Sequence, residues 1–441
     1  MSELTPSAPP TDADTPARPV GLTERVNLLD ALRGFALCGV FISNSFMWFS
    51  GRTLLPREQA QAQMAPLLEV VVGSLYQFFV NQKFITLFSF LFGLGFSIQM
   101  SRAEARGASI VPLYTRRLLI LLGLGLTHLF AIWVGDILHT YAIVGLALLL
   151  FRSRSTRTVA IWAFGLLVVM PLLVPSILKY GPVLLHGAEA ADEAAKARTA
   201  EEAGHRARLL AALSSDAFFT AQAGNGRYFL DTLIRPNKLL WMGLILSRFL
   251  FGLLAGRLLL LQDVEGRRAL HRRILPWGLA VGLLLNGTGL VMQRLRTAGV
   301  YTPPDNVWMF LLNSSQEIGY VAMAAGYVSL FALLFQRERW RRVLGVLEPV
   351  GRMALSMYLL QSVISVCLYN GWGLGLIGQL PPSRVVAMAL GIFAVQVVLS
   401  HWWLARFRFG PAEWLWRSLT YGRVQPMRLA AREGAAGAAT S

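Results

Sequence analysis

The sequence predicts an all-α fold: a polytopic integral membrane helix bundle of about ten transmembrane helices, with both termini cytoplasmic. The first observation is composition. Of 441 residues, 55% are hydrophobic and only 15% are charged, whereas about a quarter of the residues of a soluble protein are charged. The second is that apolar runs recur along almost the whole chain. The third is that arginines fall in short clusters between those runs.

Ten segments are apolar over a length that fits a bilayer, which a helix crosses in about 20 residues, with a range of roughly 17–25. A further apolar stretch, 67–80, reads either as an interfacial helix or as part of a longer second span. The ten predicted spans are residues 28–49, 82–101, 118–134, 137–151, 158–178, 239–261, 274–293, 311–335, 351–370 and 385–405.

The arginine clusters predict the orientation of these spans, because positive residues concentrate in short loops on the cytoplasmic side. With the N-terminus inside, the inner loops hold most of the clustered arginines, the short outer loops hold few, and the loop at 135–136 holds none. Removing any one span breaks this alternation. The inner loops are 102–117, 152–157, 262–273 and 336–342.

The chain divides into two membrane halves of five predicted spans, separated by a long outer loop. The first part of this loop is rich in alanine with mixed charges, which predicts one or two helices outside the membrane. The N-terminal residues lack a signal-peptide pattern, so we expect an uncleaved first span. The predicted units are a disordered cytosolic tail at 1–27, a half at 28–180, the helical loop at 181–238, a half with an interfacial segment at 239–422, and a disordered tail at 423–441.

The charge and the cysteines narrow the classes of function. The net charge of +17 reflects the arginine clusters beside the spans, so we predict no nucleic-acid partner. The predicted partners are the lipid bilayer and a small-molecule substrate. The two cysteines, Cys38 and Cys367, lie inside apolar runs and imply no disulfide framework.

Residues 118–151 hold the main candidate site. These 34 residues lie between two arginine clusters on the same side and make roughly 51 Å of helix, too long for one span and enough for two short ones. The bend falls near Gly135 and Asp136. His128 then lies deep in the membrane and His139 one turn past the bend, so the three polar side chains are predicted to gather in the outer half of the membrane.

His128, Asp136 and His139 are therefore the predicted catalytic residues. A histidine with a carboxylate partner is a general base with a fixed tautomer, and the same set can form a proton relay in a transporter. We predict no metal, because no ligand spacing marks such a site. In the structural alternatives, Asp136 is a solvated turn residue that caps the helix beginning at Ile137, and His139 lies near the headgroups. His128 lies deeper, where polar groups need partners.

The first span holds three residues predicted to bind substrate. Asp30 and Arg33 lie three residues apart on one helical face at the inner boundary, where they can pair. An arginine there can receive a phosphate from a cytosolic ligand, because its planar fork matches phosphate oxygens. The alternative is an anchoring arginine that snorkels to the inner surface. Asn44 lies higher on the same helix, near the level of His128.

Three other charged residues are also predicted to bind substrate. Arg248 lies about ten residues into its span, where an arginine has to face a partner or a water-filled cavity. Glu317, on the eighth span, is a partner for it, and Lys83 at the outer start of the second span faces the same outer cavity. The alternative for Arg248 and Glu317 is a structural ion pair. Glycines on these spans predict close helix packing: Gly93, Gly95, Gly252 and Gly256.

Five motifs together resemble a known family. LLDALRGFALCGVFISN, KFITLFSFLFGLGF, GLTHLFAIWVGDILHTYAIVGLALL, GRMALSMYLLQSVI and GPAEWLWRSLTYG occur in this order. This arrangement resembles the YeiB-like bacterial membrane proteins, whose C-terminal part is a domain of unknown function (DUF418). The resemblance covers residues 27–422. It implies a multi-pass protein of the bacterial cytoplasmic (inner) membrane.

The stretch LDALRGFAL also resembles the first span of the transmembrane acyltransferases. That resemblance implies that an acyl group moves from cytosolic acyl-CoA to an acceptor, often a sugar, on the far side. Arg33 would match the donor-side arginine, acyl-CoA would be the donor substrate, and no cofactor is implied. Those enzymes commonly carry a catalytic histidine in or just after the first span. Here Asn44 occupies the comparable position, so either His128 has taken that role or the chemistry is absent.

Three hypotheses follow. In a membrane acyltransferase, Arg33 holds the donor and His128, oriented by Asp136, activates the acceptor hydroxyl. The alternative is a transporter of a small solute, which the opposite orientation of two five-span halves favours, although the halves show no convincing sequence similarity. A non-catalytic membrane partner is the third, and it predicts that the deep polar residues pair off in dry contacts without a pocket.

Overall fold

A computed structural model describes residues 27–107, 109–302 and 307–429. These residues form helices and turns without a β-strand, so the all-α prediction is confirmed for the described part of the chain. The predicted tail at 1–27 lies outside it, except for Asn27, which begins the first helix. Residues 423–429 of the second predicted tail instead pack against the protein: Trp414 donates a hydrogen bond to the Gln425 carbonyl at 2.7 Å. Residues 430–441 lie outside the described part.

The first half of the chain and the long loop are helical, as expected. Their helices are α1 (Asn27–Asn44), the π-helix η3 (Ser45–Phe49), α2 (Arg57–Ala62), α3 (Leu67–Leu75), the π-helix η4 (Tyr76–Val80), α4 (Lys83–Glu104), α5 (Val111–Ala131), α6 (Leu138–Leu148), the 3₁₀-helix η5 (Leu149–Phe151), α7 (Thr156–His186), α8 (Ala188–Leu213) and α9 (Phe218–Thr232). The stretch 67–80 is thus helical, and a turn at Asn81 and Gln82 joins it to α4.

The second half contains the remaining helices. They are α10 (Pro236–Arg257), α11 (Arg268–Thr297), α12 (Val307–Phe335), α13 (Glu338–Gly345), α14 (Glu348–Arg352), α15 (Ala354–Tyr369), α16 (Pro382–Leu404) and α17 (Pro411–Tyr421). The predicted interfacial segment forms α17, which packs against α5 and α15.

Eight helical segments of the described chain are long and apolar enough to cross a membrane. They are Asn27–Phe49, Leu67–Glu104, Val111–Ala131, Thr156–His186, Pro236–Arg257, Arg268–Thr297, Trp308–Phe335 and Pro382–Leu404. The two other predicted spans fall on shorter apolar helices, Leu138–Phe151 and Ala354–Tyr369. The chain is therefore a membrane protein by the length and composition of its helices.

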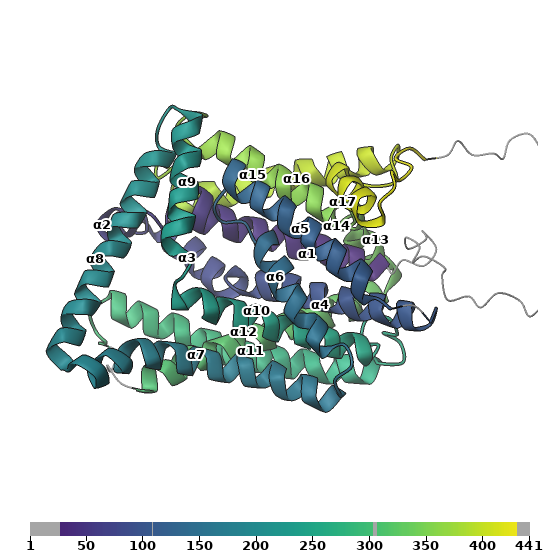
Figure 1. Cartoon of the computed structure of the whole chain (residues 1–441), viewed down its shortest axis with the longest axis horizontal. Helices are drawn as coiled ribbons and strands as arrows, with labels where there is room; N and C mark the ends of the chain where they lie inside the picture. The colour runs from purple at the N-terminus through teal and green to yellow at the C-terminus, as the bar shows by residue number, and fades with distance from the viewer. Residues whose placement is uncertain (1–26, 108, 303–306, 430–441) are drawn as a thin grey trace, which may run out of the picture.

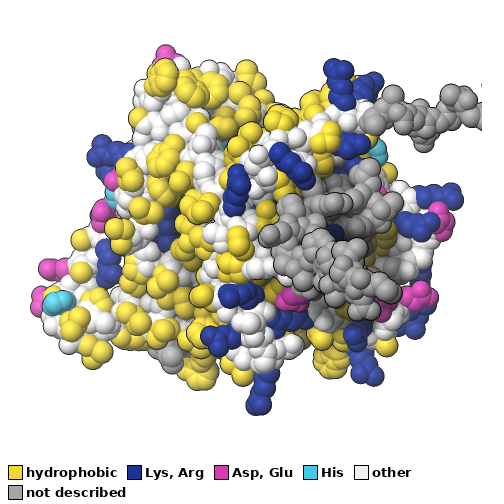
Figure 2. Space-filling view, turned by 45° about the vertical axis from the view of Figure 1, so that its right-hand side comes forward, with side chains coloured by type: hydrophobic (Ala, Val, Ile, Leu, Met, Phe, Trp, Pro, Cys, Tyr) yellow, Lys and Arg dark blue, Asp and Glu magenta, His cyan; other side chains and the backbone are white. Residues whose placement is uncertain are grey.

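The long helices run side by side, with distinct structures at the two ends of the bundle (Figure 1). Helices α8 and α9 lie together at the left-hand end, and α13, α14 and α17 lie at the opposite end. Figure 2 brings this second end forward and shows Lys and Arg side chains around it, while hydrophobic side chains cover much of the flank. The orientation of the bundle in the membrane remains a prediction from these positive residues, which concentrate on the cytoplasmic side of membrane proteins.

Helix α1 lies between two parts of the core. On one side Leu37 and Phe41 pack with residues of α5 and α15. On the other, Leu32 and Ala36 pack with residues of α4 and α12. Because it touches both groups of helices, α1 joins the N-terminal half to the C-terminal half. It also places Arg33 at one end of the bundle and Asn44 nearer the other.

Glycines allow the closest helix contacts, but only some of the predicted ones do so. A Cβ atom built on Gly93 of α4 would lie 1.9 Å from the Phe249 carbonyl oxygen of α10. One built on Gly252 of α10 would lie 2.0 Å from the Phe90 carbonyl oxygen. Gly95 differs, because a Cβ there has no neighbour within 4 Å. The prediction of close packing is therefore correct for Gly93 and Gly252 and wrong for Gly95, which faces away from the contact.

Candidate functional site

The turn between α5 and α6 brings the three predicted catalytic residues together. Helix α5 ends at Ala131, and the chain reverses so that Asp136 lies between two histidines. Nδ1 of His128 is 2.8 Å from Oδ1 of Asp136, and Nδ1 of His139 is 2.8 Å from Oδ2. The backbone N–H of His139 also donates to Oδ2 at 2.9 Å, so Asp136 caps the start of α6. The predicted capping role and the predicted cluster are both present, but Asp136 is buried and not solvated.

The surroundings define the tautomer of the neutral His128 imidazole. The side chains of Asp136 and His128 are 0% and 1% exposed. The backbone N–H of His139 also bonds the carboxyl group, and such donors favour the ionised carboxylate. Because a carboxylate can only accept, each histidine Nδ1 carries the hydrogen that it donates. The neutral His128 imidazole therefore has its lone pair on Nε2.

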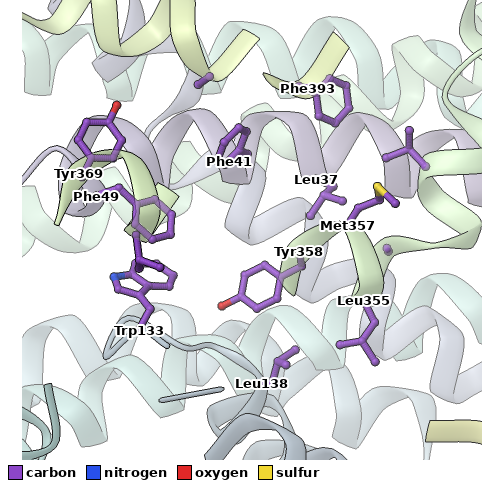
Figure 3. Packing of buried hydrophobic residues seen from close by; sticks show 14 of the residues in the cluster. Leu37, Phe41, Phe49, Trp133, Leu138, Leu355, Met357, Tyr358, Tyr369 and Phe393 are labelled. Carbon is purple, nitrogen blue, oxygen red and sulfur yellow. The ribbon is translucent and has the colours of Figure 1, made fainter. Parts of the chain in front are cut away.

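Nε2, the other ring nitrogen of His128, has no hydrogen-bond partner in the described structure. This nitrogen is also buried. The imidazole lies beside two aromatic rings, with ring centroids 6.3 Å from Trp133 and 5.3 Å from Tyr358. Figure 3 shows Tyr358 directing its hydroxyl toward the side where Trp133 lies. That hydroxyl accepts a hydrogen bond from the backbone N–H of Ile137 at 3.3 Å, so α15 supports the same turn.

Helix α9 of the long loop packs beside His139. The rings of His139 and Phe229 meet edge to face, with centroids 5.7 Å apart. The other imidazole nitrogen of His139, Nε2, lies 3.2 Å from the Thr140 hydroxyl. His139 therefore has contacts on both nitrogens and on its ring. Of the two histidines of the turn, His128 is therefore the one with a buried ring nitrogen that has no partner among the described residues.

Gly125 of α5 permits the close approach of the turn. A Cβ atom at this position would lie 2.4 Å from the His139 backbone nitrogen and 3.0 Å from Oδ2 of Asp136. Any side chain here would push α6 and the carboxylate away. The sequence does not distinguish Gly125 from Gly123 on the same helix. In the structure they differ, because a Cβ atom at Gly123 has no neighbour within 4 Å.

The predicted residues of the first span lie in two places. Arg33 donates to Asp30 at 2.7 Å, as predicted, and also to the Gly351 carbonyl of α14 at 3.2 Å. This pair lies at the end of the bundle that carries α13 and α17. Asn44 is the last residue of α1, where the helix passes into the π-helix η3. Its side chain is half-buried.

Arg117 of α5 is a residue of the inner end that sequence reasoning missed. It lies near enough to Arg33 for the two guanidinium groups to repel each other. Arg117 donates to the Gln99 side chain at 2.8 Å and lies over the Trp416 ring of α17, with 4.1 Å from Cζ to the ring centroid. Arg117 lies in a predicted arginine-rich inner loop, and in the sequence the arginines of such loops are interpreted only as signals of membrane orientation.

The other predicted charges form a second centre in the bundle. Arg248 of α10 is fully buried and bonds Glu317 of α12 at 2.9 Å, which confirms the predicted pair. Lys83 is also fully buried and interacts electrostatically with Glu317. These residues come from other helices than the histidine turn. The nine predicted site residues thus separate into the turn, the inner end with Arg33, and this charged centre, with Asn44 at the end of α1.

The described residues contain no group of three or more His, Cys, Asp and Glu side chains placed to hold a metal ion. In the turn, the carboxylate of Asp136 bonds Nδ1 of both histidines.

Comparison with known proteins relates this chain to a family of unknown function. A family model described as "Protein of unknown function (DUF418)" matches residues 255–423. "Uncharacterized protein YxaH" of Bacillus subtilis is 33% identical over 93% of this chain and 98% of the relative. "Uncharacterized protein YeiB" of Escherichia coli is 26% identical over 91% of this chain and 98% of the relative. No solved structure matches.

Proposed function

This chain belongs to the YeiB-like family of DUF418 membrane proteins, and we propose that it transfers an acyl group from cytosolic acyl-CoA to a hydroxyl acceptor on the outer side of the bacterial cytoplasmic membrane. The observation that carries this proposal is the state of His128. Its Nδ1 is held by a buried carboxylate, while its Nε2 is buried without a partner among the described residues. A general base needs this combination of a fixed tautomer and a free lone pair.

The reaction uses the histidine turn in two steps. Nε2 of His128 removes the proton of the acceptor hydroxyl as its oxygen attacks the thioester carbonyl carbon. The tetrahedral intermediate then collapses, the C–S bond breaks, and the imidazolium returns the proton to the departing thiolate, so that CoA leaves as a thiol. Asp136 stabilises the imidazolium and keeps the ring oriented, as a buried carboxylate does in other histidine-based catalysts.

The donor side of the proposal rests on the two arginines at the inner end. Arg33 and Arg117 lie at the same end of the bundle and repel each other electrostatically, and a phosphate group bound by both would offset that repulsion. From Arg33 to Asn44, helix α1 extends about 16 Å along its own axis. A donor anchored at the inner end therefore needs an extended arm to bring its thioester to the level of His128.

The decisive experiment measures binding and turnover of acyl-CoA by purified protein. Binding of acetyl-CoA and longer acyl-CoAs is followed by calorimetry, and CoA release with D-glucose as the probe acceptor is followed by mass spectrometry. We expect Arg33→Ala to weaken binding and His128→Gln to abolish release while binding persists.

Two exposed residues supply matched controls, Arg273→Ala and His186→Gln, and both variants are expected to behave as the parent. Absence of acyl-CoA binding by well-folded parent protein, or full release by His128→Gln, would overturn the proposal.

A second candidate, transport of a small solute, has one observation in its favour. Charged groups lie inside membrane-crossing helices at Lys83, Arg248 and Glu317, and such groups commonly mark solute or proton pathways. Flux of labelled solutes into liposomes is the test for this candidate. A non-catalytic membrane partner would show neither turnover nor flux.

A further inference from the structure

We propose that the cavity between η4, α11 and α12 binds a small polar anion bearing a phosphate or carboxylate group together with a hydroxyl or amino donor. The cavity has a volume of about 240 Å³. It shares no lining residue with the histidine turn, and the proposal holds whether or not His128 catalyses acyl transfer.

The walls of the cavity are polar, although the helices that form them are apolar enough to cross a membrane. Helices in lipid turn polar side chains inward only where a partner or a ligand meets them. The polar lining includes Asn286, Gln293 and Arg296 from α11 and Asn313, Gln316 and Tyr320 from α12. Such a surface suits a molecule with several hydrogen-bonding groups.

Asn286 supplies a specific unmet acceptor in this wall. The residue is 6% exposed, and its amide nitrogen donates to the Gly282 carbonyl at 2.6 Å. Its Oδ1 is buried and has no hydrogen-bond partner in the described structure. Because a buried polar atom is expected to be paired, the ligand needs an O–H or N–H group that reaches this oxygen.

Lys83 provides positive charge at the edge of the cavity. Its side chain is fully buried, and Nζ donates to the Gln77 carbonyl at 2.8 Å. The same ammonium lies over the Tyr320 ring, 4.7 Å from the centroid. Gln77 and Tyr320 both line the cavity, so Lys83 lies directly behind its wall.

Arg248 and Glu317 form an ion pair next to the cavity wall, since Glu317 follows the lining residue Gln316 in α12. One guanidinium nitrogen of Arg248 bonds Glu317, but Nε and Nη1 are buried without a partner among the described residues. Buried donors are expected to be paired, so these two nitrogens favour a further acceptor nearby, which a bound anion can supply.

The experiment uses the full chain in phosphatidylcholine nanodiscs, with sn-glycerol 3-phosphate as the anionic probe and glycerol as its neutral match. We expect calorimetric binding of glycerol 3-phosphate and none of glycerol. Arg296→Glu, at an exposed position of the lining, is expected to weaken binding at least tenfold, as is Lys83→Met. Arg273→Gln, exposed at the other end of α11, and His128→Gln are expected to bind as the parent does.

The source of the anion is distinguished by adding phosphatidylglycerol to the nanodiscs. If this lipid blocks the free probe, the site takes a lipid headgroup; if the free probe still binds, the site takes a soluble anion. Absence of probe binding in phosphatidylcholine, equal binding of glycerol, or unchanged affinity in Arg296→Glu would overturn the proposal. The Arg296 variant keeps the test valid if Lys83→Met does not fold.

Discussion

Nδ1 of His128 lies 2.8 Å from the carboxylate of Asp136, and neither side chain is more than 1% exposed. The first residue belongs to a membrane-crossing helix and the second to the turn that follows it. Their contact leaves the opposite ring nitrogen of His128 unpaired among the described residues. The two polar residues of this apolar segment therefore form one hydrogen-bonded pair, and Nε2 of His128 is its free nitrogen.

Replacement of Asp136 by Asn tests the hydrogen bond between the carboxylate and Nδ1 of His128. The amide cannot stabilise an imidazolium, and it can present a donor to Nδ1, which selects the wrong tautomer. We expect the rate of CoA release to fall about 100-fold or more, with acyl-CoA binding unchanged. Asp216→Asn, at an exposed position, serves as the matched control for the carboxylate change. A parent-like rate in Asp136→Asn would show that the carboxylate does not orient the base.

Gly125→Ala tests the packing of the turn. The new methyl group would overlap the His139 backbone nitrogen, which lies 2.4 Å from its ideal position. We expect the free energy of unfolding to fall by about 1–3 kcal/mol. Gly123→Ala on the same helix meets no atom within 4 Å, so it is expected to be neutral or slightly stabilising. Thermal unfolding of both variants in detergent measures the difference, and equal midpoints would contradict the described packing of α5 against α6.

A second glycine pair tests the contact between α4 and α10. A Cβ on Gly93 would lie 1.9 Å from the backbone oxygen of Phe249, and backbone atoms cannot move aside as a side chain can. We therefore expect Gly93→Ala to lower the unfolding temperature and Gly95→Ala to leave it unchanged or raise it. The decisive result is the order of the two variants: a reversal would mean that α4 presents another face to α10.

Glu413 of α17 is expected to make stability depend on pH. Its carboxyl accepts hydrogen bonds from the backbone N–H groups of Leu355, at 2.6 Å, and Ser356, at 3.1 Å, and so caps α15. Burial nevertheless raises the pKa of Glu413, because it outweighs these hydrogen bonds. A raised pKa in the folded protein means that this group stabilises most at low pH, and that the contribution is lost as the pH rises through the folded-state pKa.

The comparison of the parent with Glu413→Gln isolates this effect, because the amide does not titrate. Unfolding midpoints are measured from about pH 4, near the ordinary pKa of a glutamic acid, to pH 8. We expect the stability of the parent relative to the variant to decrease with rising pH. A constant difference between the two proteins would refute the titration of Glu413 in this range.

Much of the site was predictable because it depends on local sequence. The histidines and Asp136 lie within one apolar hairpin, and the length of that hairpin predicts where it bends. Asp30 and Arg33 pair because three residues separate them on one helix. The pairing of Arg248 with Glu317 was predicted from depth alone, since a charge inside a membrane-crossing helix needs a partner.

The remaining parts of the site depend on segments that are distant in the chain. Tyr358 of α15 accepts a hydrogen bond from the turn at Ile137, and Phe229 of α9 covers His139. The motif containing Tyr358 was recognised, but nothing in it indicates which helix the hydroxyl meets. The sequence indicates Arg117 only as an orientation signal, although it interacts electrostatically with Arg33 in the folded protein.

The sequence by itself determined that this protein is an all-α membrane protein and which polar residues lie at depth, because the hydrophobic length of a span and the cost of a charge in lipid are properties of each segment. Only the tertiary structure decided which nitrogen of His128 stays free, which of two neighbouring glycines touches a partner helix, and that the buried Lys83 contacts two residues of a cavity wall. Those outcomes depend on how far each helix is rotated and where it crosses the next, which no single segment encodes.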